Sequence, residues 1–163
     1  QISEMKVDVP MLAMTHCDAS KLAKQHGAKS EFALCASQWH KTLTYKDKFF
    51  GDGIKYDKDF TKAYGYAPPY QAAESSAALL VFKDAFERAN SFDTKKVRDA
   101  LAKTKMQTFY GNIKFGSGGQ NTAKPMVLFQ VMCKSGKCEN VVVAPTKWAA
   151  AELIHPIPPW SKR

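Results

Sequence analysis

The residues Thr15-His16-Cys17-Asp18 place a hydroxyl, an imidazole, a thiol and a carboxylate directly after a short apolar segment. Residues 7–15 predict a buried strand, and residues 21–24, stopped by Gly27, predict a short helix after it. Residues 32–37 predict a second strand, so the order predicts a βαβ unit with parallel strands. Ligands of open α/β sheets bind at the carboxyl ends of such strands, which makes residues 15–18 a candidate binding site.

Each of these side chains also has a simpler interpretation. Asp18 is equally suited to capping the helix that follows, and His16 to a surface or hydrogen-bonded loop. The neighbours His16 and Cys17 would point apart on a continuing strand, so a Cys–His nucleophile is not supported. The sequence also lacks a Gly-x-Ser-x-Gly elbow, a phosphate-binding Gly-rich loop and a His-Glu-x-x-His motif, so we predict no enzyme activity.

A second candidate site lies at the start of the strongest predicted helix, residues 70–90, which follows Pro68-Pro69. Helical spacing predicts an apolar stripe and, on the other side, two opposite-charge pairs. The stripe comprises Ala78, Phe82, Ala85 and Ala89, widened by Leu79 and Phe86, and the pairs are Lys83–Glu87 and Asp84–Arg88. Glu74 lies at the end of the stripe, which predicts contact with a cleft or a partner. The alternative is a first-turn acid favoured by the helix dipole.

Three aromatic or polar residues could join Glu74 at such a cleft. Tyr70 is suited either to stacking over a ligand or to filling a core, and Gln71 follows it in the first helical turn. Trp39, with His40 beside it, follows the second strand and is a further candidate to line the same cleft.

The four cysteines fall into two local pairs. Cys133 and Cys138 flank a short turn that contains Ser-Gly, a spacing that favours a disulfide across a hairpin in an oxidising compartment; reduced thiols are the alternative. Cys17 and Cys35 form a second possible pair, although Cys35 lies in an apolar strand where it could serve packing alone. No further His or Cys pair at metal spacing accompanies them, so neither a metal nor a cofactor is implied.

The rest of the chain predicts few strands for its helices. Residues 38–58 predict an irregular crossing segment, and residues 59–64 a short helix ending at Gly65. The predicted elements after residue 90 are a helix capped by Asp93 with Val97, Ala100 and Leu101 inward, strands 112–116, 126–133 and 140–144, and an extended proline-rich tail 154–163 anchored by Trp160. One βαβ unit and a detached hairpin cannot cover a long amphipathic helix, so we expect a fragment of a larger protein.

The net charge of +9 raises the question of a polyanionic partner. The lysines are scattered, and many lie beside acids, as in residues 55–59, which favours a solvated basic surface and argues against nucleic acid as a partner. No apolar run approaches the roughly 18 residues that span a bilayer. The chain begins at Gln1 without a signal-like pattern in residues 1–10, so we expect processing or truncation before this point.

Four stretches, residues 9–27, 32–39, 64–101 and 109–131, share an order and spacing with a known family. The most telling series is Tyr110-Gly111-x-Ile113-x-Phe115, a Gly/Asn turn, and then Lys124-Pro125 followed by Gln130-Val131. The series resembles the C-terminal half of type I periplasmic binding proteins, above all the leucine/isoleucine/valine- and amide-binding proteins of ABC importers. The resemblance covers most of the chain.

The resemblance implies an α/β fold of two Rossmann-like lobes that close on a ligand about a three-strand hinge. Residues 1–40 would then end the second lobe, 41–110 would cross to helices of the first lobe, and 111–163 would return to the second. The implied partners are a small solute, the membrane permease of the importer, and the remaining N-terminal part of the protein. The implied location is periplasmic or otherwise extracytoplasmic with a lipid anchor.

Ligands of this family are zwitterions or amides held by hydroxyls, backbone groups and one carboxylate. The ligand-binding candidates are therefore Thr15, His16, Asp18, Trp39, Tyr70, Gln71 and Glu74. Relatives that bind an α-amino group often carry an acid near the position of Thr15 or His16, and this chain does not. An amide or an acidic solute is thus as well supported as an aliphatic amino acid. The alternatives are a ligand-sensing regulatory domain of the same fold and, outside this class, a cationic nucleic-acid-binding or structural protein.

Overall fold

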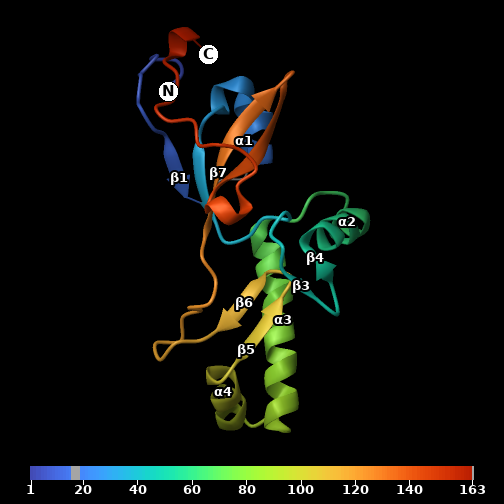
Figure 1. Cartoon of the computed structure of the whole chain (residues 1–163). Coiled ribbons are helices and arrows are strands. Elements are labelled where there is room, and N and C mark those ends of the chain that lie inside the picture. The colour runs from blue at the N-terminus through green and yellow to red at the C-terminus, as the bar shows by residue number, and fades with distance from the viewer. Residues whose placement is uncertain (16–18, 163) are drawn as a thin grey trace. The chain divides into compact units, whose positions relative to one another are not determined.

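The computed structural model describes residues 1–15 and 19–162, and its fold is mixed α/β (Figure 1). The chain divides into two compact units. The terminal unit comprises Gln1–Ser37 and Val127–Arg163, and the central unit comprises Gln38–Met126. Residues 111–126 group with the central unit, because the strand that they contain pairs there. The chain therefore passes between the units at residues 37–38 and again at residues 126–127.

The terminal unit contains a four-stranded sheet of order β1-β2-β7-β8. Its strands are β1 (Ala13–Thr15), β2 (Leu34–Ser37), β7 (Val127–Lys134) and β8 (Lys137–Ala144). The predicted βαβ unit is confirmed, since β1 and β2 are parallel and α1 (Ala19–His26) and a 3₁₀ turn (Gly27–Ser30) lie between them. The β7–β8 hairpin is also confirmed, but it is not detached, because β7 pairs antiparallel with β2.

The first strand is shorter than the predicted 7–15 because residues 7–10 contact the C-terminal tail. Val7 O accepts a hydrogen bond from Trp160 Nε1 at 2.9 Å, and Pro10 O accepts from the Ile157 N–H at 3.0 Å. Trp160 thus anchors the tail, although it opens a short 3₁₀ turn (Trp160–Lys162) rather than an extended segment. A further 3₁₀ turn (Thr146–Trp148) follows β8.

The β7–β8 hairpin turns at Ser135-Gly136, where both residues have positive φ angles of 51° and 79°. This is the backbone geometry of the tight turns that match the strand twist. Cys133 and Cys138 are register partners on either side of the turn and are joined by a disulfide. The Cys17–Cys35 pairing involves residue 17, which lies outside the described residues.

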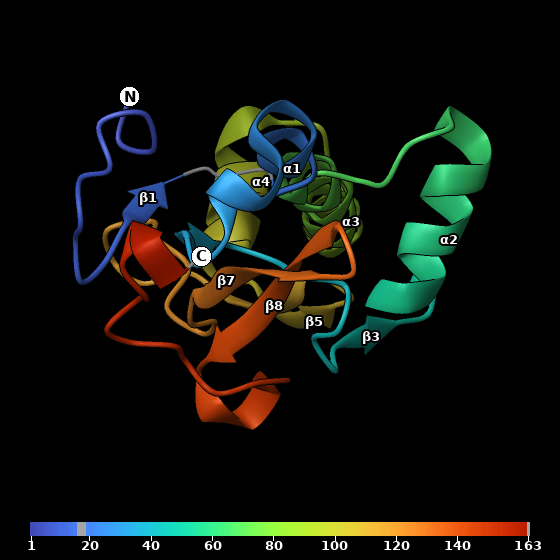
Figure 2. The same cartoon turned by 90° about the horizontal axis from the view of Figure 1, so that it is seen from above.

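The central unit is built around three helices and two short hairpins (Figure 2). They are α2 (Gly53–Tyr64), α3 (Tyr70–Ala89), α4 (Thr94–Ala102), the pair β3 (Lys46–Asp47) and β4 (Gly51–Asp52), and the pair β5 (Lys105–Thr108) and β6 (Gly111–Lys114). The predicted long helix and the Asp93 cap of α4 are confirmed, with Asp93 accepting from the Lys96 N–H. Helix α2 begins earlier than the predicted residue 59 because Asp52 caps it by accepting from the Lys55 N–H at 2.8 Å.

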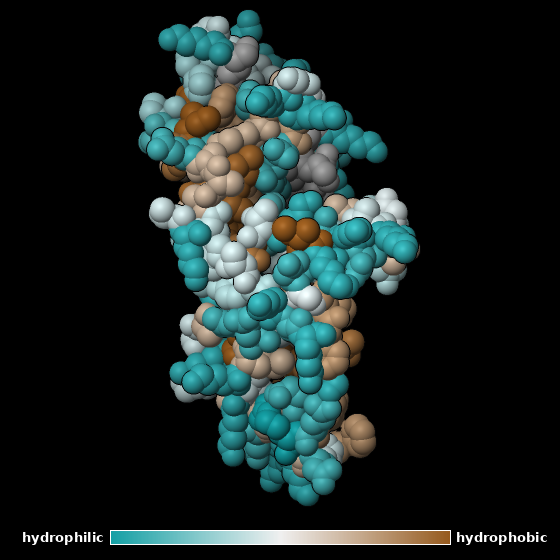
Figure 3. Space-filling view, turned by 45° about the vertical axis from the view of Figure 1, so that its right-hand side comes forward, coloured by the Kyte–Doolittle hydropathy of each residue, from teal (hydrophilic) through white to brown (hydrophobic). Residues whose placement is uncertain are grey.

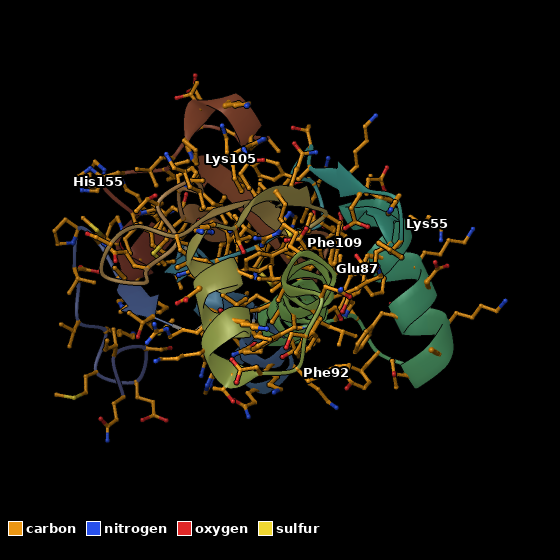
Figure 4. The ribbon with its side chains drawn as sticks, turned by 90° about the horizontal axis from the view of Figure 1, so that it is seen from below. Lys55, Glu87, Phe92, Lys105, Phe109 and His155 are labelled. Carbon is orange, nitrogen blue, oxygen red and sulfur yellow. A yellow bond between two sulfur atoms is a disulfide. The ribbon has the colours of Figure 1, made fainter. Side chains whose placement is uncertain are left out.

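An aromatic cluster forms much of the core of the central unit. Tyr56 stacks on Phe109 with centroids 4.2 Å apart, and Trp39 meets both rings edge-on. Asp47 supports the cluster, since its Oδ2 accepts from the Phe109 N–H at 2.7 Å. Phe109 lies among the inner side chains in Figure 4, whereas Phe92 lies at the periphery.

The buried face of α3 differs from the predicted stripe. The buried positions are Ala73, Ala77, Leu80, Val81 and Ala85. Ala85, Phe86 and Ala89 of the predicted stripe pack on α4, but Leu79 and Phe82 are 65% and 46% exposed. The helix is apolar on nearly all sides between residues 77 and 82, so the sequence pattern does not select one face.

Both predicted ion pairs of α3, Lys83–Glu87 and Asp84–Arg88, are confirmed.

No helix within the described part of the chain is both long and apolar enough to span a membrane. On the face shown in Figure 3, hydrophilic side chains surround scattered apolar ones.

Candidate functional site

The structure describes only part of the strand-to-helix site predicted at residues 15–18. Thr15 is the last residue of β1 and is exposed. His16, Cys17 and Asp18, the other residues of this predicted site, lie outside the described residues.

Glu74, one residue of the site predicted at the start of α3, lies at a groove in the central unit. Glu74 lines this groove, and Gln38 lines it as well. Tyr70 is the first residue of α3, and Gln71 beside it is exposed and does not line the groove. Trp39 is buried in the aromatic cluster rather than in the groove.

The groove has a volume of about 670 Å³ and lies between α3, α4 and the strand and loop that begin at β6. Its walls are mainly apolar. They are formed by Ala77, Ala78, Val81 and Phe82 of α3, Leu101 and Ala102 of α4, and Ile113 and Phe115 in and after β6. The size and the apolar lining are those of a site for a small organic molecule.

One end of the groove is polar, where Glu74, Tyr110 and Lys124 meet. The Lys124 ammonium lies 4.3 Å from the centroid of the Tyr110 ring, within the range of a cation–π interaction, and donates a hydrogen bond to Gln38 O. Within the described residues Glu74 makes no ion pair, so its carboxylate stays available at the groove surface.

The pKa values at this end are perturbed chiefly by burial. Burial lowers the pKa of Lys124 from 10.5 to about 8, and the negative charge of Glu74 partly opposes this shift. Burial also raises the pKa of Tyr110 strongly, with smaller contributions in the same direction from Glu74 and Tyr70. Tyr70 is therefore electrostatically coupled to this end of the groove.

Other polar groups line the rest of the groove. Asn121 and Ser117 belong to the loop after β6, and Arg98 projects from α4, where it pairs with the neighbouring Asp99. The Asn121 side chain also holds the loop, since its Nδ2 donates to Asn112 O and its Oδ1 accepts from the Lys114 N–H, both at 3.0 Å.

Sequence reasoning missed Lys124 and Tyr110 as members of the site. Both belong to the series of residues that carried the family resemblance, so the signal was present but was not connected to Glu74. The connection depends on contacts between residues far apart in the sequence, such as Lys124 with Gln38.

Across 1–15 and 19–162, no group of three or more His, Cys, Asp or Glu side chains could hold a metal ion. His40 is two residues from Gln38 in the sequence, but its Nδ1 lies 2.8 Å from Oγ1 of Thr42, and burial, aided by the charge of Lys41, lowers the pKa of His40.

Comparison with known proteins gives one family. A family model described as periplasmic binding protein matches residues 1–137. A leucine-binding protein from Thermotoga maritima is similar at 25% identity and a TM-score of 0.64, over 83% of this chain and 37% of that one.

Two more distant structures share the fold. The leucine-, isoleucine-, valine-, threonine- and alanine-binding protein from Brucella ovis, in a closed conformation, has 14% identity and a TM-score of 0.71, over 96% of this chain and 42% of its own. The branched-chain amino acid transporter substrate-binding protein from Streptococcus pneumoniae, in complex with isoleucine, has 16% identity and a TM-score of 0.63, over 87% and 39%. The chain thus spans about two fifths of the length of these structures.

Proposed function

Because this chain belongs to the periplasmic binding protein family, we propose that it binds a small polar solute for an ABC importer. The observation that carries the proposal is the family match over residues 1–137. The similar structures named above bind leucine, isoleucine and related amino acids, which supports an amino acid or an amide as the solute. The proposed role is binding and delivery, without catalysis.

Capture of the solute by closure of two lobes is the mechanism that family membership supports. The proposed partner is the membrane permease of the importer, and the proposed location is extracytoplasmic. The Cys133–Cys138 disulfide supports that location, since disulfides persist in oxidising compartments. The remainder of a two-lobed protein would complete the binding cleft.

The proposed contacts of the solute are those that the sequence predicts. Thr15, His16 and Asp18 contribute hydroxyl, imidazole and carboxylate groups. Glu74 offers the carboxylate that accepts from an amine or amide, while Tyr70 and Gln71 precede it at the start of α3.

Trp39 contributes indirectly in this proposal. Its ring packs edge-on against Phe109, which directly precedes Tyr110 in the groove wall. Trp39 would therefore stabilise the wall without touching the solute.

Differential scanning calorimetry of the purified two-lobed protein with a panel of solutes tests this function. The panel contains leucine, isoleucine, short aliphatic amides and short-chain acids. A ligand at a hundred times its Kd stabilises the folded state by about 2.7 kcal/mol, which is readily measured. One class is expected to raise the melting temperature.

Two variants connect binding to the proposed contact. Glu74→Gln is expected to weaken the best solute at least about tenfold, because a charge-assisted hydrogen bond is lost. Glu139→Gln, an exposed acid of β8 outside the groove, serves as the matched control and should bind like the wild type. The absence of stabilisation by every member of the panel would contradict the proposed function.

A further inference from the structure

The two connections between the units are tied to one another at both of their ends. In the terminal unit, Ser37 of β2 is the register partner of Val127 of β7. Ser37 is the last residue before the first connection, and Val127 is the first residue after the second. In the central unit, Lys124 donates from Nζ to the carbonyl oxygen of Gln38. This hydrogen bond joins the first residue of the central unit to a residue just before its end.

The path of the Lys124 side chain explains why two parts of the sequence motif occur together. Its methylene stem crosses Gly111, so a Cβ at Gly111 would overlap Cδ of Lys124. Gly111 also has a φ of 154°, which a larger residue adopts with strain. The ammonium then passes over the Tyr110 ring to reach Gln38. Tyr110, Gly111 and Lys124 therefore form one cluster of contacts.

Burying a charged side chain at this position costs free energy of desolvation. Most of the Lys124 side chain is removed from water, and no carboxylate of the described residues forms an ion pair with it. A methionine could cover Gly111 and Tyr110 equally well without the desolvation cost. A methionine can supply neither a donor for Gln38 O nor a cation over the Tyr110 ring, and of these two contacts the hydrogen bond is the one that reaches the connection at Gln38.

We propose that Lys124 is a positioning residue that fixes the connection at Gln38 against the connection that follows residue 124. It holds both connections where they leave the central unit, by way of Gly111 and Tyr110. This role goes beyond solute binding and does not depend on which solute is bound. Loss of the donor should free both connections while the rest of the central unit stays packed.

Hydrogen–deuterium exchange of the solute-free protein, followed by mass spectrometry, tests the proposal. In Lys124→Met, peptides that cover residues 36–41 and 122–128 are expected to exchange about tenfold faster than in the wild type. Peptides from α4 and from the β7–β8 turn, which contain neither connection, should keep their wild-type rates. Gly111→Ala should reproduce the same pattern, because the added Cβ displaces the lysine stem.

Lys114→Met provides the control, since Lys114 is an exposed lysine of the neighbouring strand β6. It should leave exchange in all these peptides unchanged. Wild-type exchange at residues 36–41 in Lys124→Met would overturn the proposal. Faster exchange throughout the central unit would also overturn it, because Lys124 would then be a general stabiliser. The measurement contains no solute, so a failure of the proposed transport function leaves its outcome unaffected.

Discussion

Nη2 of Arg88 lies 2.9 Å from Oγ1 of Thr104, a buried residue that follows the C-terminus of α4. The same guanidinium donates from Nη1 to Ala100 O at 2.8 Å and holds Asp84 through Nε and Nη2. Arg88 therefore does more than form the predicted pair on the surface of α3. It fastens the end of α4 to α3 with donors that satisfy buried acceptors.

Arg88→Ala should lower the free energy of unfolding by about 1.5–3 kcal/mol, because hydrogen bonds from a charged donor to buried acceptors are lost. Chemical denaturation monitored by circular dichroism measures the change. The matched control is Arg98→Ala on α4, whose partner Asp99 is its sequence neighbour and whose side chain is mostly exposed. An exposed pair contributes at most about 1 kcal/mol, so equal effects of the two variants would contradict this interpretation.

Gln130 in β7 provides a second test, because its buried amide secures the C-terminal tail. Nε2 donates to Phe32 O at 3.1 Å and to Ile154 O at 3.0 Å, and Oε1 accepts from the Ile154 N–H at 2.9 Å. Gln130→Leu should cost about 2–4 kcal/mol, since buried backbone groups lose their partners. Limited proteolysis should then cleave within residues 150–160 sooner than in the wild type. The exposed Gln120→Leu should change neither stability nor cleavage, and a Gln130→Leu protein that behaves likewise would rule out this role.

Local patterns in the sequence predicted local structure well. Pro68-Pro69 marked the start of α3, Asp93 the start of α4, and the Ser-Gly turn the β7–β8 hairpin. These signals depend on the conformational preferences of a few adjacent residues, which the sequence states directly. The start of α2 was missed because Asp52 caps it from within a segment that is irregular in its hydrophobic pattern.

Contacts between distant residues could not be predicted in the same way. Strand β5 is recognisable only through its pairing with β6, and β7 joins the sheet only through its pairing with β2. Glu74 was predicted to contact a cleft or a partner, but the polar end of the groove also contains Lys124 and Tyr110, which are 50 and 36 residues away in the sequence. A periodic pattern states which face is apolar, not what covers that face.

The pH dependence of stability should carry a contribution from Lys124. The unfolded chain holds this proton up to about pH 10.5, whereas the folded chain releases it near pH 8. Between these values the unfolded state binds more protons, so this group makes the free energy of unfolding rise with pH. Glu74 and Tyr110 are the titratable groups that face Lys124. The pKa of Tyr110 is raised, and its contribution has the opposite sign only above about pH 10.

Denaturation curves of the wild type and of Lys124→Met, measured between about pH 8 and pH 10, isolate this contribution. Their difference in unfolding free energy should grow in favour of the wild type as the pH rises. Lys114→Met, whose lysine is exposed in β6, should run parallel to the wild type across the range. A pH-independent difference between Lys124→Met and the wild type would show that the amine titrates as it does in water.

The coupling between Glu74 and its neighbours gives the last prediction. The charge of Glu74 raises the pKa of both Lys124 and Tyr110, so Glu74→Gln should lower both values. Titration of the lysine ε-methylene signals by NMR and of the phenol by ultraviolet absorbance would follow the two groups separately. The control is Glu87→Gln, because Glu87 lies thirteen residues further along α3 and pairs with Lys83. This variant should leave both titrations unchanged. If Glu74→Gln also leaves the Lys124 titration in place, the carboxylate does not reach the polar end of the groove, and its proposed role as the acceptor for a solute amine would lose its electrostatic basis.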